Sequence, residues 1–466
     1  MVFPGFNALR RQIANFVDPN NRFINSFNDA FLWGVGGGYT AYDTSNITYI
    51  EKGYNVNPIV YAVVNQMAKK TAAVPFYVRE VKDKKAYKRL QQLQRATKGN
   101  YSMLQLFKRY QLEQKAYEKE DKPFPMDRPN VYQTWSEFMA LYKTFLACTG
   151  NVYIYTLAPE DGPLAGQPSQ VYLLPSQYIQ IIVKPNADML GIESPIAGYQ
   201  LTYGRTGTKF LASEVIHIKY SNPNYGENGE HLYGQSPLRA ALKNIQSSNS
   251  ALDLNIKTLK SGGAFGLIHG KNTAITEKQA KELKNRLLEM DKSPEQLSKL
   301  AGISTEIGFT RLSLTSDELK PFDYLKFDQK QICNVLSWSD KLLNNDEGAK
   351  YDNVNQYRKQ VVTDNIQPDL KMYEEAINTH WLKRFKGYEN CVIEFDVMEL
   401  PEMQEDLQKL TEWLTQMLDR GVINRAEARE GIRYPETGNA DMEVFTVNND
   451  VMTLEEAIDT SFTIGQ

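Results

Sequence analysis

Apolar residues between positions 236 and 262 recur at alternating steps of four and three, which is the spacing of one face of a helix. Ser236 suits the N-cap and Pro237 the first helical position, while Gly262 and Gly263 favour an end to the helix. The apolar stripe contains Leu238, Leu242, Ile245, Leu252, Ile256 and Leu259, with Asn249 as its one polar member. The pattern fits an amphipathic helix on an ordinary core, and it fits equally a helix packed beside copies of itself.

The three-four spacing returns after Pro321 and predicts a second long helix, again with one polar position in its apolar stripe. This stripe consists of Phe322, Leu325, Gln329, Ile332 and Leu336. Residues 263–317 lie between the two helices and contain short strand patterns on either side of a helical pattern at 276–290. We therefore expect two similar helices that bracket a small αβ insert.

The first half of the chain predicts a mixture of helices and strands. Residues 57–81 predict a helix followed by a strand, and residues 82–122 predict a helical insertion on the surface with little core. Residues 129–159 predict a helix that is N-capped by Thr134 and ends at Gly150, followed by a strand. Short strands separated by Gly, Pro and Asn clusters follow and predict an antiparallel sheet.

The C-terminal part begins with a polar loop at 339–353, where charged residues, Asn and one Gly replace the apolar pattern. A long helix is predicted over 353–382, and Pro368 should kink it because proline lacks the N–H that a helix interior needs. A strand is predicted over 391–400, and a pair of helices around Gly421 follows.

Composition places the chain among folded soluble proteins, with 42% hydrophobic and 23% charged residues, and 466 residues suffice for about three domains. The formal net charge of −3 argues against a protein that grips nucleic acid over a broad basic surface. The three cysteines form no CxxC pair, which favours a reducing compartment. Residues 1–56 are rich in Gly and Asn and predict a flexible arm that is neither a signal peptide nor a membrane span.

Candidate chemistry is sparse. None of the four histidines has a Cys, His or acidic neighbour at metal-ligand spacing, so we expect no metal site. The segment at 266–272 lacks the glycine spacing and hydroxyl residue of a phosphate-binding loop, and Gly234–Leu238 lacks the final glycine of a nucleophile elbow. We therefore expect no catalytic residue, no cofactor and no enzymatic activity.

Six stretches of the sequence are nevertheless informative, because of the order in which they occur. They are NPIVYAVVNQMAKKTAAVPFYV, PNVYQTWSEFMALYKTFLACTGNVYIY, EVIHIKY, GQSPLRAALKNI with its exit SGGAFGLI, DYLKFDQKQICNVLSW and RGVINRAEAREGI. Their order and spacing over residues 55–435 resemble the portal proteins of tailed bacteriophages, of the long-tailed-phage type. That family forms the ring at one vertex of the capsid.

The resemblance implies an α+β portal fold in a ring oligomer, with a wing, a two-helix stem, a small αβ clip, a kinked tunnel helix and a helical crown. The implied parts are an N-terminal arm at 1–56, a wing at 57–235 with the helical insertion 82–122, stem helix 1 at 236–262, the clip at 263–317, stem helix 2 at 318–338, the tunnel loop at 339–354, the tunnel helix and wing return at 355–400, and the crown and C-terminal tail at 401–466.

The resemblance also implies roles for individual residues. The implied tunnel-loop residues beside DNA are Lys341, Leu342, Leu343, Asn344, Asn345 and Lys350, and the candidates for stem contacts with DNA are Lys257, Lys260, Lys326 and Lys330. The implied subunit-packing residues are Leu238, Leu242, Ile245, Leu252, Ile256, Leu259, Leu325, Ile332 and Leu336. Apolar stripes would then face neighbouring subunits or the wing, and polar faces would line a channel.

The implied function is a dodecameric ring in the virion, assembled in the host cytoplasm, through which double-stranded DNA is packaged and ejected. The ring would dock the terminase large subunit and a head–tail adaptor, contact the major capsid protein and a scaffold protein, and nucleate capsid assembly without any membrane. Another non-enzymatic head–tail connector or virion ring component is the alternative. Such connectors are usually shorter and lack a helix–αβ–helix hairpin.

Overall fold

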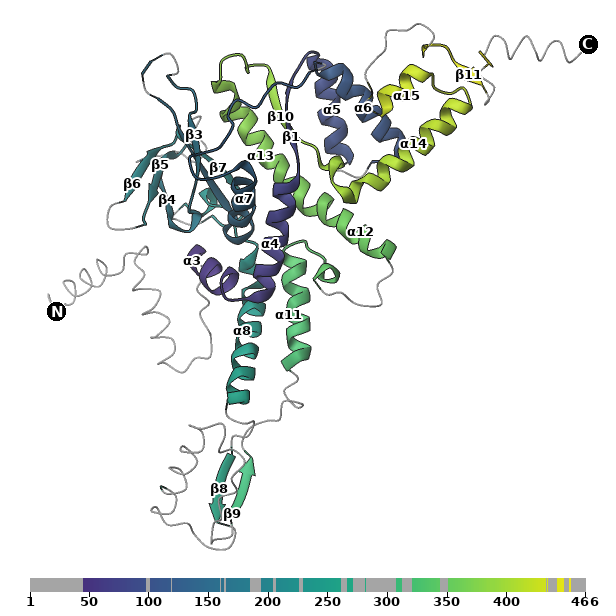
Figure 1. The fold of residues 1–466 in the computed structure, drawn as a ribbon. Helices are drawn as coiled ribbons and strands as arrows, with labels where there is room; N and C mark the ends of the chain where they lie inside the picture. The colour runs from purple at the N-terminus through teal and green to yellow at the C-terminus, as the bar shows by residue number, and fades with distance from the viewer. Residues whose placement is uncertain are drawn as a thin grey trace, which may run out of the picture. The chain divides into compact units, whose positions relative to one another are not determined.

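The computed structural model describes residues 45–97, 101–118, 120–159, 161–162, 165–184, 194–203, 207–225, 229–260, 266–270, 281, 307–311, 321–343, 351–432, 434, 442–447 and 452–453. The chain divides into two compact units, one formed by residues 1–242 and 334–466 and the other by residues 243–333 (Figure 1). The division falls within two long helices, α8 (Leu238–Lys260) and α11 (Pro321–Val335).

The first unit begins with structure where the sequence predicted a flexible arm. Helix α3 (Asn46–Thr48) leads into the π-helical η1 (Tyr49–Tyr54), and the hydroxyl of Ser45 accepts a hydrogen bond from the N–H of Thr48 at 3.2 Å. The prediction for 1–56 is therefore wrong for residues 45–56, because the ring of Tyr49 is buried. Residues 1–44 lie outside the described part of the chain.

The helix and strand predicted within residues 57–81, and the helix and strand predicted within residues 129–159, are confirmed. Asn57 caps α4 (Pro58–Ala73), and β1 (Phe76–Glu80) follows. Thr134 and Glu137 form a capping box at the start of α7 (Trp135–Thr149), which satisfies two backbone donors reciprocally. Gly150 ends that helix with a φ of +71°, a left-handed conformation that glycine adopts without steric cost.

The predicted antiparallel strands form two sheets of three strands rather than one. The first sheet has the order β3 (Gln170–Leu174), β2 (Asn151–Leu157) and β7 (Val215–Lys219), and the second has the order β4 (Ile179–Val183), β5 (Ile196–Leu201) and β6 (Thr208–Leu211). Pro175 and a short 3-10 helix separate β3 from β4, so the chain leaves the first sheet there. Tyr153 and Tyr199 pack edge to face between the sheets, with ring centroids 5.5 Å apart.

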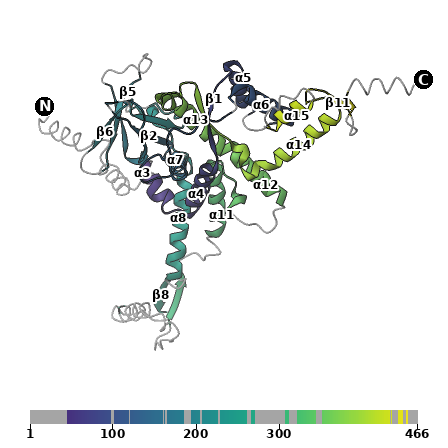
Figure 2. The same cartoon turned by 45° about the horizontal axis from the view of Figure 1, so that its top comes forward.

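The insertion at 82–122 forms two helices, α5 (Lys84–Thr97) and α6 (Met103–Ala116), as predicted. The expectation of little core is wrong, because Leu90, Leu106 and Tyr110 are buried. Helix α6 packs beside the C-terminal helices in both views, and the ring of Phe107 lies 5.9 Å from that of Trp413 (Figure 2). The insertion is thus part of the hydrophobic core.

The long C-terminal helical run consists of α12 (Tyr351–Val361), the π-helical η6 (Val362–Ile366) and α13 (Gln367–His380). Pro368 lacks an N–H and would clash with the carbonyl four residues earlier. The predicted kink at Pro368 stays a prediction, and the structure shows a π-helical turn directly before this proline. Helix α12 begins at Tyr351, so the polar loop ends before the predicted boundary at residue 353 or 354.

Strand β10 (Cys391–Phe395) pairs antiparallel with β1, and the helix pair α14 (Gln404–Asp419) and α15 (Arg425–Gly431) follows, as predicted. The turn between those helices contains Gly421 with a φ of +66°. Short elements complete the unit: 3-10 helices Ser176–Tyr178, Glu230–Leu232, Asp340–Leu342, Leu382–Arg384, Val397–Glu399 and Pro401–Met403, and strands Thr446–Val447 (β11) and Met452–Thr453 (β12).

The second unit contains most of α8 and α11 together with the antiparallel pair β8 (Gly266–Gly270) and β9 (Ile307–Arg311). The amide of Asn244 donates to Asp328 at 2.8 Å and links the two helices inside this unit. The predicted helix 276–290 and the predicted helix end at Gly262 and Gly263 lie outside the described residues. Among the described helices, none combines the length and the apolar character that a membrane crossing requires.

Candidate functional site

Hydrogen bonds fix the start of α8 to the end of α7. They join two short segments, residues 148–151 and 234–238, that are distant in the sequence. The side chain of Asn151 accepts from the N–H of Gly234 and donates to the carbonyl of Gly234 at 3.0 Å. The hydroxyl of Ser236 donates to the carbonyl of Cys148 at 2.6 Å and accepts from the N–H of Leu238 at 3.1 Å. Ser236 is therefore the predicted N-cap, and it also anchors the helix to its neighbour.

A buried polar cluster lies beside this anchor. The ammonium of Lys143 is fully buried, pairs with Asp369 and donates to the side-chain oxygen of Asn365 at 2.6 Å. The hydroxyl of Tyr220 is a second donor to Asp369, at 2.7 Å. Burial lowers the pKa of Lys143, and the carboxylate of Asp369 opposes that shift. Removing one member would leave a buried charge without its partner, so the cluster holds α7 and α13 in one arrangement.

Asn365 extends this cluster to the end of α11, because its amide donates to the carbonyl of Leu336 at 2.7 Å. Ser337 follows with a φ of +51°, which is a left-handed conformation that non-glycine residues seldom adopt. A cavity of about 210 Å³ lies here, between these residues, Met67 and Pro237. We call Lys143, Asn365, Asp369, Leu336 and Ser337 the helix junction. It fixes the chain just before the polar loop and in the π-helical turn after it.

The structure describes three of the six predicted tunnel-loop residues. Lys341 is exposed in the 3-10 helix, and Leu342 and Leu343 are half-buried beside it. Asn344, Asn345 and Lys350 lie outside the described residues.

The predicted packing stripe divides into a buried part and a more exposed part. Leu238, Leu242 and Ile245 on α8, and Ile332 and Leu336 on the second stripe, are buried within the protomer. Leu252 and Leu325 are half-buried, whereas Ile256 is 49% exposed. The side chain of Leu259 lies outside the described part of α8. The buried members pack within a single chain, which does not leave them exposed for the predicted subunit contact.

Sequence analysis missed three exposed apolar residues of these helices. Leu254 is 41% exposed on α8, and Tyr324 and Phe327 are 61% and 57% exposed on α11. They lie off the three-four stripe, which is why periodicity did not select them. Tyr324 and Phe327 are three residues apart and therefore lie on one side of their helix.

Two of the predicted stem lysines lie on the exposed side of α11. Lys326 and Lys330 are exposed and one helical turn apart, and the helical repeat places them roughly opposite the buried Ile332. Lys257 and Lys260 belong to α8, in the part whose side chains are not described.

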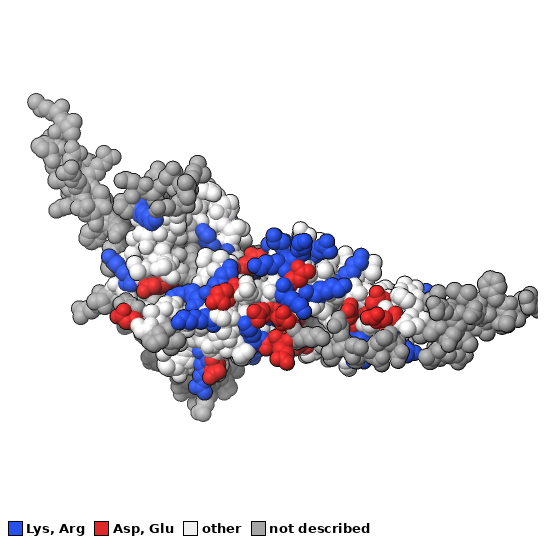
Figure 3. Space-filling view, turned by 90° about the horizontal axis from the view of Figure 1, so that it is seen from above, with Lys and Arg blue, Asp and Glu red and all other residues white. Residues whose placement is uncertain are grey.

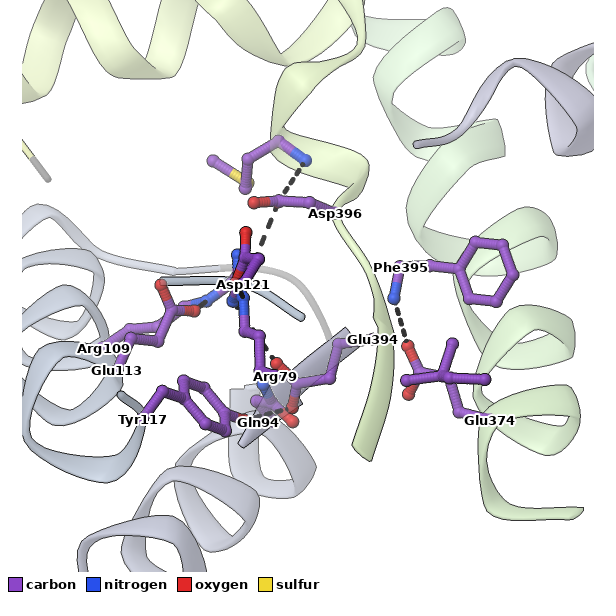
Figure 4. Close-up of polar contacts among 12 residues, drawn as sticks. Arg79, Gln94, Arg109, Glu113, Tyr117, Asp121, Glu374, Glu394, Phe395 and Asp396 are labelled. Carbon is purple, nitrogen blue, oxygen red and sulfur yellow. Dashed lines mark hydrogen bonds and ion pairs between the residues drawn. The ribbon is translucent and has the colours of Figure 1, made fainter. Parts of the chain in front are cut away.

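Buried ion pairs attach the helical insertion to the rest of the first unit (Figure 4). Arg109 contacts Glu113 at 2.7 Å and Asp396 at 3.8 Å, while Arg79 contacts Glu394 at 3.4 Å. A cavity of about 510 Å³ adjoins them, and its charged walls largely pair with one another. These ion pairs therefore have a structural role, because they join α6 to the chain at the end of β10.

The described residues contain no group of metal ligands, and the half-buried His217 makes packing and hydrogen-bond contacts instead. The ring of His217 stacks on Tyr153 with centroids 4.3 Å apart, and its Nε2 lies 3.1 Å from the side-chain oxygen of Asn151. Burial, assisted by the charge of Lys219, lowers the pKa of His217 to about 3.

Comparison with known proteins identifies the class of this fold. A sequence model of the family described as "Phage portal protein" matches residues 98–431, and the chain therefore belongs to the phage portal protein family. No curated protein matches the sequence.

Two solved structures from gene transfer agent particles share the fold at low sequence identity. A chain from the neck of a native gene transfer agent particle, computed with C12 symmetry, has a TM-score of 0.56 and 17% identity, covering 88% of this chain and 99% of that one. A chain from the virion of a native gene transfer agent particle has a TM-score of 0.55 at the same identity and coverage. An HK97 family phage portal protein from Corynebacterium diphtheriae has a TM-score of 0.47 at 11% identity, covering 75% of this chain and 98% of that one.

Proposed function

We propose that twelve copies of this chain form a ring at one vertex of a capsid, and that DNA enters and leaves through the hole in the ring. Membership of the phage portal protein family and the shared fold of a neck protein solved with C12 symmetry support this proposal. In the proposed protomer, residues 236–262 and 318–338 form the stem, 263–317 the clip, and 57–235 most of the wing.

The observation that carries the proposal is the set of exposed apolar side chains on the two long helices. Leu254 and Ile256 are two residues apart, so the helical repeat directs them to nearly opposite sides of α8. Tyr324 and Phe327 add a third apolar surface on α11. A protomer in a closed ring needs two different contact surfaces, one for each neighbour. We assign these side chains, with Leu252 and Leu325, to those contacts.

We assign the proposed channel wall to exposed lysines of the two long helices. Lys326 and Lys330 are exposed on α11, roughly opposite the buried Ile332, and would touch phosphates transiently, with Lys257 and Lys260 as further candidates. Each phosphate neutralised adds a steep salt-dependent affinity, so a continuous basic ring would hold DNA in place. Sparse lysines instead permit passage.

The polar loop would form the constriction of the channel. Lys341 is exposed for contact with phosphates, and Leu342 and Leu343 are placed to contact the duplex as an apolar ring. The helix junction would hold both ends of this loop while its tip adjusts to DNA, with Asn344, Asn345 and Lys350 nearest to it.

We further propose the partners that such a ring requires. The terminase large subunit would supply ATP hydrolysis and dock on the clip, and a head–tail adaptor would bind the same end after packaging. The major capsid protein would surround the ring, with a scaffold protein during assembly, and the ring would nucleate the capsid. The portal itself would carry out no covalent chemistry.

Electron microscopy and native mass measurement of the purified chain test the ring. We expect twelve-subunit rings with a central hole for the natural sequence, and loss of rings for the double variant Tyr324→Ser and Phe327→Ser. The matched control replaces Tyr203 and Leu211 by Ser. These residues are 67% and 63% exposed beside strands β5 and β6, away from the two long helices in the sequence. A monomeric natural chain, or equal loss of rings in both variants, would contradict the proposal.

A further inference from the structure

Helix α5 carries a dense set of positive side chains and no acidic residue. Lys84, Lys85, Lys88 and Arg89 are all exposed within its first two turns. The helical repeat places them on one side of α5, away from the buried Ala86 and Leu90. Seen from above, lysine and arginine side chains gather in the middle of the described surface, with acidic side chains beside them (Figure 3).

These four charges have no acidic partner within the part of the chain that the structure describes. Among the described residues, no carboxylate forms an ion pair with Lys84, Lys85, Lys88 or Arg89. The nearest acid in the sequence, Asp83, accepts a hydrogen bond from the backbone N–H of Lys85 at 2.7 Å. Arg95, near the other end of α5, does pair with Glu375 at 3.8 Å. These four cations are therefore grouped at one end of the helix, in a chain whose net charge is −3.

The chemistry of this face fits a phosphate backbone better than a protein or a membrane. Protein interfaces are enriched in aromatic residues and Met and depleted in Lys, and they depend on a few buried anchors. Amphipathic helices on membranes need large apolar side chains toward the lipid. The exposed positions of α5 between Lys84 and Ala96 hold Lys, Arg, Gln and one Ala, with no large apolar side chain. Sequence-independent contact with DNA comes mainly from Lys and Arg on phosphates.

The spacing also matches a duplex. Lys84 and Arg89 are separated by about 8 Å of helix, because an α-helix rises about 1.5 Å per residue. Duplex DNA carries one negative charge per about 1.7 Å of its axis with both strands counted, so the same length carries about four to five phosphates. The number of cations on the helix is thus comparable to the number of phosphates along that length.

We propose that the basic face of α5, formed by Lys84, Lys85, Lys88 and Arg89, binds the phosphate backbone of double-stranded DNA independently of the channel. The proposal rests on the proposed function for the presence of DNA beside the ring. Its role is to hold a segment of duplex against the outside of the protomer without reading its sequence.

Closed circular duplex DNA provides the test, because DNA without ends cannot thread a closed ring. Binding of full-length rings to a relaxed plasmid is measured by filter retention between 50 and 200 mM salt. The test variant replaces Lys84, Lys85, Lys88 and Arg89 by Gln. We expect at least a ten-fold weaker affinity near 100 mM salt, and a salt slope reduced by about 3 to 4, since each lost phosphate contact removes about 0.9.

A matched control carries the same loss of charge elsewhere. It replaces Lys69, Lys209, Lys383 and Arg128, which are exposed on other elements, by Gln. We expect it to keep the natural affinity within about three-fold, as only net charge has changed. Failure of natural rings to bind the plasmid, or an equal loss in both variants, would overturn the inference and leave the ring proposal intact. Absence of rings in the natural chain would instead refute the proposed function.

Discussion

Gly234 passes so close to Gly150 that a Cβ atom on Gly234 would lie 2.0 Å from the carbonyl oxygen of Gly150. The contact joins the segment before α8 to the end of α7, and the side chain of Asn151 bonds across it. The two motifs Gly-Asn-x-Tyr and Gly-x-Ser-Pro-Leu therefore form one structural feature. Glycine is required at both positions because backbone lies against backbone.

Substitution of Gly234 by Ala should destabilise the first unit by about 3 kcal/mol, since the added methyl must displace main-chain atoms rather than a flexible side chain. The free energy of unfolding from urea titration measures this effect. Gly53→Ala is the control, because its Cβ would meet Leu238 at an ordinary 3.6 Å. Equal stability of the two variants would show that the close approach relaxes at little cost.

Substitution of Arg109 by Met should cost about 3–5 kcal/mol, because the buried carboxylates of Glu113 and Asp396 would lose their positive partner. Lys108→Met is the matched control, since Lys108 is the exposed neighbour on the same helix. Urea titration measures stability, and protease cleavage within the 82–122 insertion reports its local release. An unchanged Arg109→Met protein would mean that apolar contacts alone hold the insertion.

The neutral imidazole of His217 should make folding stability depend on pH. Its pKa is about 3 in the folded protein and about 6.5 when unfolded, so the unfolded chain binds the extra proton first as pH falls. Stability should therefore decrease from pH 6.5 toward pH 3, by about 1.4 kcal/mol per pH unit from this residue.

The comparison that isolates this effect is the difference in stability between the natural chain and His217→Gln across that pH range. The difference should shift in favour of the variant at low pH, and His380→Gln, at an exposed position, should follow the natural chain. Parallel curves for the natural chain and His217→Gln would exclude a buried neutral histidine.

Charge reversal in the polar loop should impair DNA packaging while rings still assemble. Lys341→Glu with Lys350→Glu would place a repulsive charge beside each passing phosphate, and neither residue belongs to the proposed subunit contacts. Packaged DNA per particle measures the effect, and Lys209→Glu with Lys383→Glu is the control. Normal packaging by the loop variant would remove this loop from the channel.

Local signals in the sequence were sufficient for most elements. Thr134, Asn57 and Ser236 are caps whose side chains bond to backbone only a few residues away, so their effect is readable from the sequence. The split into two sheets, the strand β6 and the core under the insertion were missed. Those features depend on which distant segments pack together, and the Lys- and Gln-rich composition of 82–122 concealed the apolar positions that reach the core.

The sequence by itself determined most of the helices and the caps that begin them, and the order of motifs indicated the family, because capping and periodicity act over a few residues. Only the tertiary structure decided which stripe residues are buried and which are exposed. Leu242 and Ile256 occupy equivalent positions of one helical stripe, yet one is 5% and the other 49% exposed. Burial depends on which other segments pack against a side chain. A periodic pattern shows which residues share one face of a helix, but not what covers that face.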